Sequence, residues 1–266
     1  MNLRAVVRDF LPAPLQLWVR SHRTWRAGEP ELAVLDSISA PGRTFVDVGA
    51  NLGLYAHAAV LRGMRVVAVE PHPLLARNLR RLFGKKVTVI HAALSDRPGR
   101  RSMYLPSYAG RELDARGSLE VAANQGLAQR EIMIETTTLD ALELREVAVI
   151  KIDVEGHELA VLQGGRRLIQ RDRPTLLVEI EERHHPGGSA AVFALLEELD
   201  YRCYFFWRQR LWPLAEFEPA RHQASHLAKK PDQAGSPDYA CNFVCIPAES
   251  IVVAERLTER GMLTRS

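Results

Sequence analysis

The chain has few cysteines, and their arrangement excludes a disulfide-rich scaffold. Its 266 residues include three cysteines, Cys203, Cys241 and Cys245, which is an odd number without a C-x-x-C spacing. Disulfide frameworks and cysteine metal sites need paired or regularly spaced cysteines. We therefore expect a protein of a reducing compartment.

Long apolar runs and an excess of one charge are also lacking. No stretch approaches the roughly 18 apolar residues of a membrane span, and Arg4, Arg8 and Asp9 stand where a signal peptide needs an apolar core. We therefore expect a cytoplasmic protein without integral membrane association. The 35 basic and 32 acidic residues give a net charge of +3, which is too even to indicate nucleic-acid binding.

The composition is that of an ordinary globular protein, with 47% hydrophobic and 25% charged residues. Seven apolar or β-branched runs alternate with segments that have helical apolar spacing. This alternation is typical of an α/β fold with an open, mostly parallel sheet and helices on both faces. The seven runs are 44–48, 65–69, 87–90, 147–152, 175–180, 201–206 and 242–246.

We expect one main domain at residues 41–250, preceded by an N-terminal helical extension (1–40) and followed by a C-terminal tail (251–266). Residues 1–20 have the pattern of a short amphipathic helix, which we expect to pack on the domain surface; contact with a membrane or a cap over the site is the alternative.

Two polar stretches interrupt the alternation, residues 106–130 and 219–239. The first lies between the strand-like runs 101–105 and 132–138, so it predicts an inserted hairpin or loop. We expect both stretches near the substrate, because ligands bind at the carboxyl ends of such strands.

The segment from Thr44 to Tyr55 reads as a buried strand that runs through a glycine turn into a helix. Gly49 and Gly53 allow a tight turn and a close approach to a ligand, and the free N–H groups of the helix point to the same place. Glu70 ends the next strand, 23 residues after Asp47. An acidic residue at about that distance commonly binds the hydroxyls of a ribose.

The spacing argues against a dinucleotide. In a G-x-G-x-x-G motif starting at Gly49, the other two glycine positions hold Asn51 and Leu54. A carboxylate beside the turn repels a pyrophosphate and favours an ammonium group. The pattern therefore predicts a nucleoside with a cationic tail, such as S-adenosylmethionine. We expect the turn from Asp47 to Gly53, which includes Asn51, to surround the methionine part, and Glu70 to bind the ribose. The alternative is an ordinary βαβ turn that binds nothing.

A second motif, Ile150-Lys-Ile-Asp-Val-Glu-Gly-His-Glu158, follows the fourth run. Together with Asp47-Val-Gly-Ala-Asn-Leu-Gly53 it resembles the FkbM family of S-adenosylmethionine-dependent methyltransferases. The resemblance covers about residues 44–204 and includes, in the family's order, the segments 69–71, 92–96, 117–119, 138–140, 162–164 and 178–180. It implies a Rossmann-like class I methyltransferase sheet of seven strands with the last one antiparallel, and methyl transfer to a hydroxyl of a sugar or natural product.

Methylation of a hydroxyl needs a group that accepts the proton. Asp153 is the first candidate, because it ends the fourth strand at the cofactor crevice and is also a candidate for binding the cofactor. His157 is a second candidate, since its unperturbed pKa is about 6.5. Simple helix capping remains the alternative interpretation for both residues.

Glu179 is the third catalytic candidate, because a carboxylate inside an apolar strand needs a partner. Glu179 and Asp153 together could supply oxygen ligands to a Mg²⁺ ion, so such an ion stays open. No His/Cys cluster with ligand spacing supports a metal, and we therefore predict no metal ligands. The charged run Glu181, Glu182, His184 and His185 is interpreted as a solvated loop.

For the adenine, the position after the third strand indicates Ser95 or Asp96, although both also fit a turn before Pro98-Gly99. The acceptor is expected to be a small hydroxylated molecule. Two other functions stay open: a non-catalytic nucleoside-binding or scaffold protein with this fold, and a nicotinamide-dependent oxidoreductase. The sequence does not indicate the oligomeric state.

Overall fold

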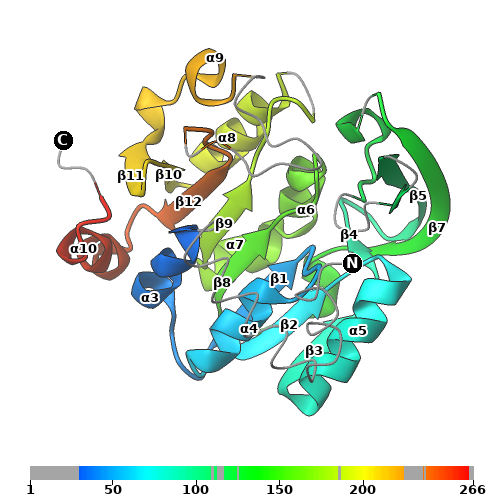
Figure 1. Cartoon of the computed structure of the whole chain (residues 1–266). Helices are drawn as coiled ribbons and strands as arrows, with labels where there is room; N and C mark the ends of the chain where they lie inside the picture. The colour runs from blue at the N-terminus through cyan, green and yellow to red at the C-terminus, as the bar shows by residue number, and fades with distance from the viewer. Residues whose placement is uncertain are drawn as a thin grey trace, which may run out of the picture.

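The computed structural model describes residues 30–108, 111–112, 117–124, 126–184, 187–224, 236 and 238–263 (Figure 1). The amphipathic helix expected within residues 1–20 lies outside these residues. None of the helices in the described part of the chain has both the length and the apolar character that a membrane span needs.

The main sheet has eight strands in the order β11-β10-β12-β9-β8-β1-β2-β3. The five strands from β9 to β3 are mutually parallel, and β12 runs antiparallel to both of its neighbours. The seven predicted strands and the antiparallel last strand are thus confirmed. The strands are β1 (Thr44–Val48), β2 (Arg65–Val69), β3 (Val87–Ile90), β8 (Val147–Ile152), β9 (Thr175–Glu179), β10 (Tyr201–Trp207), β11 (Arg210–Pro213) and β12 (Asn242–Pro247).

The eighth strand, β11, was not predicted. It pairs with β10 through a two-residue turn in which Arg208 and Gln209 have φ angles of 48° and 65°. Positive φ at both central residues is the geometry of a tight hairpin turn that usually carries Asn-Gly or Asp-Gly. The Arg-Gln pair gives no such signal in the sequence.

Helices cover both faces of the main sheet, as predicted (Figure 1). Alternate residues of β1 face opposite layers, so that Phe45 packs with α3, α4, α5 and α10, and Val46 packs with α6, α7 and α8. The α-helices are α3 (Leu35–Ile38), α4 (Leu54–Leu61), α5 (Pro73–Phe83), α6 (Glu158–Gly164), α7 (Arg166–Asp172), α8 (Gly188–Glu198), α9 (Pro219–His222) and α10 (Ile251–Glu259). Short 3-10 helices are η1 (Pro30–Val34), η2 (Gly84–Lys86), η4 (Val121–Asn124), η5 (Asp140–Leu142) and η6 (Leu214–Glu216).

The predicted insertion is a second, smaller sheet beside the main one (Figure 1). Its strands, in the order β4-β7-β5-β6, are β4 (Ala93–Leu94), β7 (Ala128–Thr137), β5 (Gly99–Tyr108) and β6 (Arg111–Glu112). The long strands β5 and β7 pair antiparallel, and β6 lies between them in the sequence. The sheet encloses a small core of its own, formed by Ala93, Met103, Leu105 and Ile134.

Both ends of the described chain pack on the main sheet. Leu35 of α3 and Leu257 of α10 are fully buried and belong to one hydrophobic cluster. Residues 251–259 are therefore a packed helix, whereas the sequence suggested a tail. The domain boundaries themselves stay a prediction.

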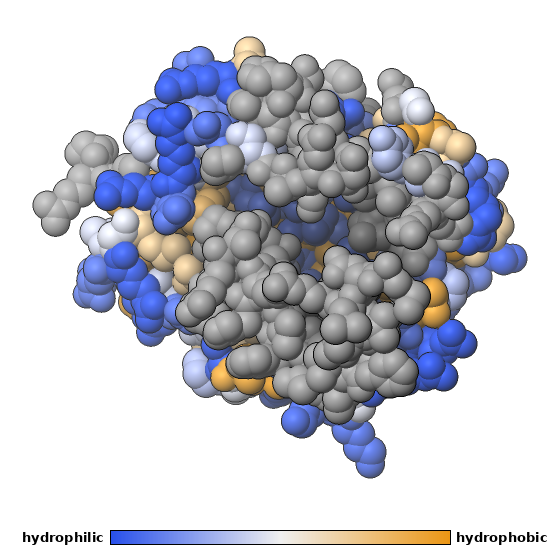
Figure 2. Space-filling view, viewed as in Figure 1, coloured by the Kyte–Doolittle hydropathy of each residue, from blue (hydrophilic) through white to orange (hydrophobic). Residues whose placement is uncertain are grey.

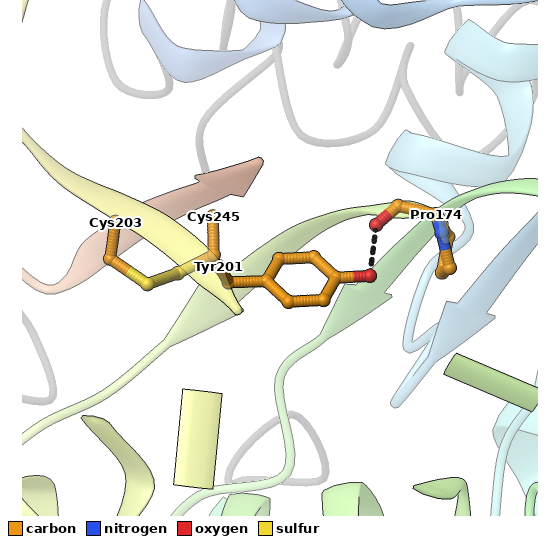
Figure 3. Close-up of a disulfide and its surroundings, with 4 residues drawn as sticks. All are labelled: Pro174, Tyr201, Cys203 and Cys245. Atoms are coloured by element: carbon orange, nitrogen blue, oxygen red, sulfur yellow. Dashed lines mark hydrogen bonds between the residues drawn. A yellow bond between two sulfur atoms is a disulfide. The ribbon is translucent and has the colours of Figure 1, made fainter. Parts of the chain in front are cut away.

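The interpretation of the cysteines as having no pairing pattern is wrong for two of them. Cys203 of β10 and Cys245 of β12 stand directly opposite each other, with 4.1 Å between their Cα atoms, and form a disulfide (Figure 3). Cys241 is free and half-buried. The two partners are 42 residues apart in sequence, and only the register of the antiparallel strands brings them together.

Candidate cofactor site and active site

A cavity opens at the carboxyl ends of β1, β2 and β8, where a ligand was expected. Five of the predicted site residues line it: Gly49, Asn51, Glu70, Asp153 and His157. Near the middle of the face in Figure 2, a recessed patch of hydrophilic surface is visible among the described residues. The predicted crevice is therefore present, with acidic groups from two different strand ends.

Glu70 is held in the cavity wall by backbone hydrogen bonds. Its Oε2 accepts the N–H of Asn51 at 2.7 Å, and its Oε1 accepts the N–H of His72 at 2.8 Å. Only 4% of Glu70 is exposed, and burial raises the pKa of its carboxyl to about 7 although the two hydrogen bonds lower it. Each oxygen keeps a lone pair for another donor, so this fixed group suits the two hydroxyls of a ribose.

An apolar slot lies beside Glu70. It fits the flat, weakly polar ring of a nucleobase, because nucleosides place the base next to the ribose. The apolar residues that line the cavity come from both the main sheet and the insertion: Val48, Val69, Pro71, Leu75, Ala92, Ala93, Leu94, Met103, Leu119 and Val154.

Ser95 and Asp96 are not among the residues that line the cavity. The Ser95 hydroxyl donates to Asp96 Oδ1 at 2.9 Å, and Arg101 donates to the same oxygen at 2.8 Å. The bond from Ser95 lowers the pKa of the exposed Asp96 carboxyl. Their proposed contact with adenine stays a prediction.

The two glycines of the turn have the predicted backbone conformation, and neighbouring elements pack closely against both. Gly49 and Gly53 have φ angles of 77° and 80°, which favour glycine. A Cβ atom at Gly49 would overlap the carbonyl oxygen of Asp153, and one at Gly53 would lie 2.7 Å from Leu79 and Phe83 of α5. The missing side chains thus allow the end of β8 and helix α5 to pack closely against the turn, and the close approach of a ligand stays a prediction.

Asp47 lies beneath the turn and is not part of the cavity wall. Its Oδ2 accepts the N–H of Ala56 at 2.9 Å, in the first turn of α4. Burial raises the pKa of Asp47 to about 7, and the nearby charge of Lys151 opposes this shift. Asp47 therefore joins α4 to the strand end, and its contact with a methionine ammonium stays a prediction.

Lys151 is a site residue that the sequence analysis missed. It is 2% exposed, and its Nζ lies 3.6 Å from Asp153 Oδ2 and 3.9 Å from Glu179 Oε2. The ring of Tyr55 lies 5.1 Å from the same ammonium. A lysine inside the otherwise apolar strand 147–152 was the available signal.

The catalytic candidates Asp153 and Glu179 form a coupled pair beside this lysine. Burial raises the pKa of Asp153, and Lys151 and a hydrogen bond with Glu179 oppose the shift. Burial and the charge of Asp153 raise the pKa of Glu179 well above its ordinary value. The predicted need of Glu179 for a partner is confirmed, and Asp153 does not cap α6, whose N-cap is His157 without a side-chain bond.

The pair does not fit the Mg²⁺ ion that the sequence left open. A divalent ion between Asp153 and Glu179 would have to stand where the Lys151 ammonium already lies within 4 Å of both carboxylates. Like charges at that separation repel strongly in a poorly solvated site. We derive no step through a metal ion.

His157, the other catalytic candidate, has both ring nitrogens engaged. Nε2 lies 3.0 Å from the Ser95 hydroxyl, and Nδ1 lies 2.6 Å from Glu120 Oε1. The ring thereby joins the start of α6 to the insertion. This arrangement favours a structural role and leaves its role as a base a prediction.

The charged run after β9 is partly buried, contrary to the interpretation as a solvated loop. Glu181 is 8% and His184 3% exposed, and one ligand atom each of Glu155, Glu181 and His184 lie within 4.8 Å of one another. Arg183 binds both oxygens of Glu181 at 2.6 and 2.7 Å, and Tyr239 donates to Glu181 at 2.6 Å.

His184 completes the balance of charge in this cluster. Its Nε2 lies 3.0 Å from Glu155 Oε2. Burial lowers the pKa of His184, but the bond with Glu155 and the charges of Glu155 and Glu181 outweigh burial, so the net shift is upward. The guanidinium of Arg183 already lies against both carboxylates, 2.6 Å from Glu181 and 3.8 Å from Glu155, so the set does not fit a metal ion.

Comparison with known proteins agrees with this geometry. Residues 47–203, more than half of the chain, match the family model described as the Methyltransferase FkbM domain. No curated protein matches the chain.

Two solved structures illustrate the structural similarity. Methyltransferase FkbM from Methylobacillus flagellatus KT is 16% identical with a TM-score of 0.47, over 91% of this chain and 57% of that protein, so this chain spans little more than half of its length. A TehB-like SAM-dependent methyltransferase from Corynebacterium glutamicum is 9% identical with a TM-score of 0.42, over 88% and 95% of the two chains. Because the family model matches more than half of the chain, over residues 47–203, the chain belongs to the FkbM methyltransferase family.

Proposed function

We propose that the protein is an S-adenosylmethionine-dependent O-methyltransferase that acts on a hydroxyl of a small sugar or natural-product-like acceptor. The main support is one cavity that has Glu70 at one end and Asp153 at the other, with an apolar slot beside Glu70. An adenosyl compound with a cationic sulfur and an ammonium group has the complementary chemistry.

In this proposal, each residue has a simple role. Glu70 accepts hydrogen bonds from the ribose hydroxyls, and the cavity wall around Gly49 and Asn51 contacts the methionine part. The cofactor supplies a methyl group that its sulfonium charge already activates. The chain aligns the acceptor with it, and such alignment can remove about 7 to 11 kcal/mol of a barrier.

The transfer step needs one base. The acceptor oxygen forms a bond to the methyl carbon, the electrons of the breaking C–S bond return to sulfur, and the hydroxyl proton passes to the Asp153 carboxylate. Asp153 is suited to this role because its side chain lines the cavity and is 36% exposed.

Titration calorimetry with S-adenosylhomocysteine is the first test, followed by a labelled-methyl screen against hydroxylated acceptors. We expect binding in the parent, and a loss of transfer of at least about 100-fold in Asp153→Asn, since general-base catalysis contributes about that much. Glu135→Gln, a change on the exposed face of β7, is the matched control. Binding without transfer to any acceptor, and identical behaviour of Asp153→Asn, would favour the non-catalytic alternative.

A cytoplasmic location is part of the proposal, because the cofactor is made there. The balanced charge supports a small-molecule acceptor and no nucleic-acid partner. The Cys203–Cys245 disulfide argues against a reducing compartment. Alkylation of free thiols under denaturing conditions at the moment of cell lysis tests the location, because Cys203 and Cys245 are buried in the fold: three modified cysteines agree with the cytoplasm, and one modified cysteine contradicts it.

A further inference from the structure

One face of the main sheet carries a row of polar side chains at its carboxyl edge. The register pairs Asp47 of β1 with Lys151 of β8, and Lys151 with Leu177 of β9. Because side chains alternate along a strand, Asp153 and Glu179 lie on the same face as Lys151, one step nearer to the cavity. Below the row, this face is apolar, with Phe45, Val149 and Leu177 in one buried cluster.

Lys151 is the cation of this row. A buried ammonium group is costly unless anions compensate for the lost water. The row provides the compensating groups, since the Asp153 carboxylate and the Glu179 carboxyl lie within 4 Å of Nζ and Asp47 is its partner in the neighbouring strand. An apolar side chain would be less costly at a position where only packing matters, so the position of Lys151 has a reason in the site.

We propose that Lys151 is a positioning residue for methyl transfer, whose ammonium keeps Asp153 ionised and aimed at the acceptor hydroxyl, in the place that a metal ion takes in metal-assisted enzymes. The inference rests on the proposed function. It also gives Glu179 a second role, in which the protonated Glu179 carboxyl donates a hydrogen bond to the Asp153 carboxylate. One cation, one anion and one neutral acid then share the edge of the sheet.

Other charged groups around Asp153 act in the opposite direction. Burial and the carboxylates of Glu155 and Glu181 raise the pKa of Asp153. The charge of Asp153 in turn raises the pKa of three neighbouring carboxyls, those of Asp47, Glu70 and Glu158. Arg183 and His184 are engaged with Glu155 and Glu181. Without the ammonium of Lys151, the surroundings of Asp153 would therefore be dominated by burial and negative charge.

The test is the titration of Asp153 itself, which needs no acceptor. In protein labelled at the aspartate carboxyl carbon, the Asp153 signal is assigned by comparison with Asp153→Asn and followed against pH by NMR. We expect Lys151→Met to raise the midpoint by one pH unit or more, because an opposite charge at this distance lowers a carboxyl pKa by about 1 to 3 units. Lys151→Arg keeps the charge, so the midpoint of Asp153 in that variant should stay within half a pH unit of the parent. Lys85 is exposed, and Lys85→Met serves as the control, in which the Asp153 midpoint should not move.

A measurement on the parent covers the case in which Lys151→Met does not fold. The Lys151 Nζ signal of the parent should change with the same midpoint as the Asp153 carboxyl, since the two groups lie 3.6 Å apart. An unchanged Asp153 midpoint in Lys151→Met, or a Lys151 signal that is indifferent to Asp153, overturns the proposal.

Binding and turnover separate this proposal from the proposed function. Lys151→Met should bind S-adenosylhomocysteine within about threefold of the parent, while the acid limb of its methyl-transfer profile moves up by the same shift as the Asp153 midpoint. A purely structural lysine would lower stability and leave the profile in place, which would overturn the positioning role. A parent that does not bind S-adenosylhomocysteine refutes the proposed function, and the titration still reports separately on the pairing of Lys151 with Asp153.

Discussion

Replacement of Gly49 by alanine should destabilise the fold and distort the site at once. Gly49 has φ 77°, a left-handed conformation that costs an alanine about 1 to 2 kcal/mol. The new Cβ would overlap the Asp153 carbonyl oxygen and lie 3.0 Å from the carbonyl carbon, so the end of β8 must move. Overpacking of this kind costs a further amount of about 1 to 3 kcal/mol. We expect a loss of about 2 to 5 kcal/mol in unfolding free energy, which is roughly 5 to 15 °C in melting temperature.

Gly42 provides a matched control for this experiment. Its φ is 78°, nearly the same as that of Gly49, but no atom lies within 4 Å of the position where a Cβ would stand. Gly42→Ala should therefore show only the conformational cost of about 1 to 2 kcal/mol. Denaturant unfolding of both variants, with and without S-adenosylhomocysteine, separates the two contributions. Equal losses in the two variants, or unchanged ligand affinity in Gly49→Ala, would refute the reasoning.

Four other perturbations test separate contacts of the fold and the site. Glu70→Ala should weaken binding of S-adenosylhomocysteine by about 1 to 3 kcal/mol, or roughly 5- to 150-fold, in calorimetry; an unchanged affinity would remove Glu70 from the site. Burial raises the pKa of Glu158 from 4.5 to about 7, so the folded protein keeps a proton that the unfolded chain has already lost. The unfolding free energy should therefore fall as pH rises through that window, by up to about 1.4 kcal/mol per pH unit for this group, and Glu158→Gln should flatten the slope. Reduction of the Cys203–Cys245 disulfide, which closes a separation of 42 residues, should cost about 4 kcal/mol in denaturant unfolding, and a variant with alanine at both positions should not respond to reductant. His157→Ala should lower stability by about 1 to 3 kcal/mol because it removes the bonds of a buried ring to the Ser95 hydroxyl and to Glu120, and a loss confined to methyl transfer would instead support a role as a base.

The sequence predicted the strands and the cavity well, because apolar runs and the glycine turn are local signals. β1 and β2 have the predicted limits, and Glu70 lies in the cavity wall as expected. Gly49 has the predicted turn conformation, but the sequence did not show that the Asp153 carbonyl, at the end of β8, packs against it. That contact depends on how β1 and β8 pair, and the local sequence does not contain it.

The remaining omissions also depend on register. Lys151 pairs with Asp47 across 104 positions of sequence, and Cys203 with Cys245 across two strands. The charged run after β9 looked solvated because its balancing partner Glu155 comes from a different strand end. Buried polar groups are compensated by distant partners, and such partners are visible only after folding.

The wall of the cavity is built from two separate sheets. Met103 and Leu119 belong to the insertion, whereas Glu70 belongs to the main sheet, and His157 bonds to Glu120 at the boundary. The side of the cavity that the insertion forms and the side that carries the row of charges therefore have different structural supports. Changes in the packing of β5 against β7 would alter how tightly a ligand fits on the first side, while the register that aligns Asp153, Glu179 and Lys151 would stay the same.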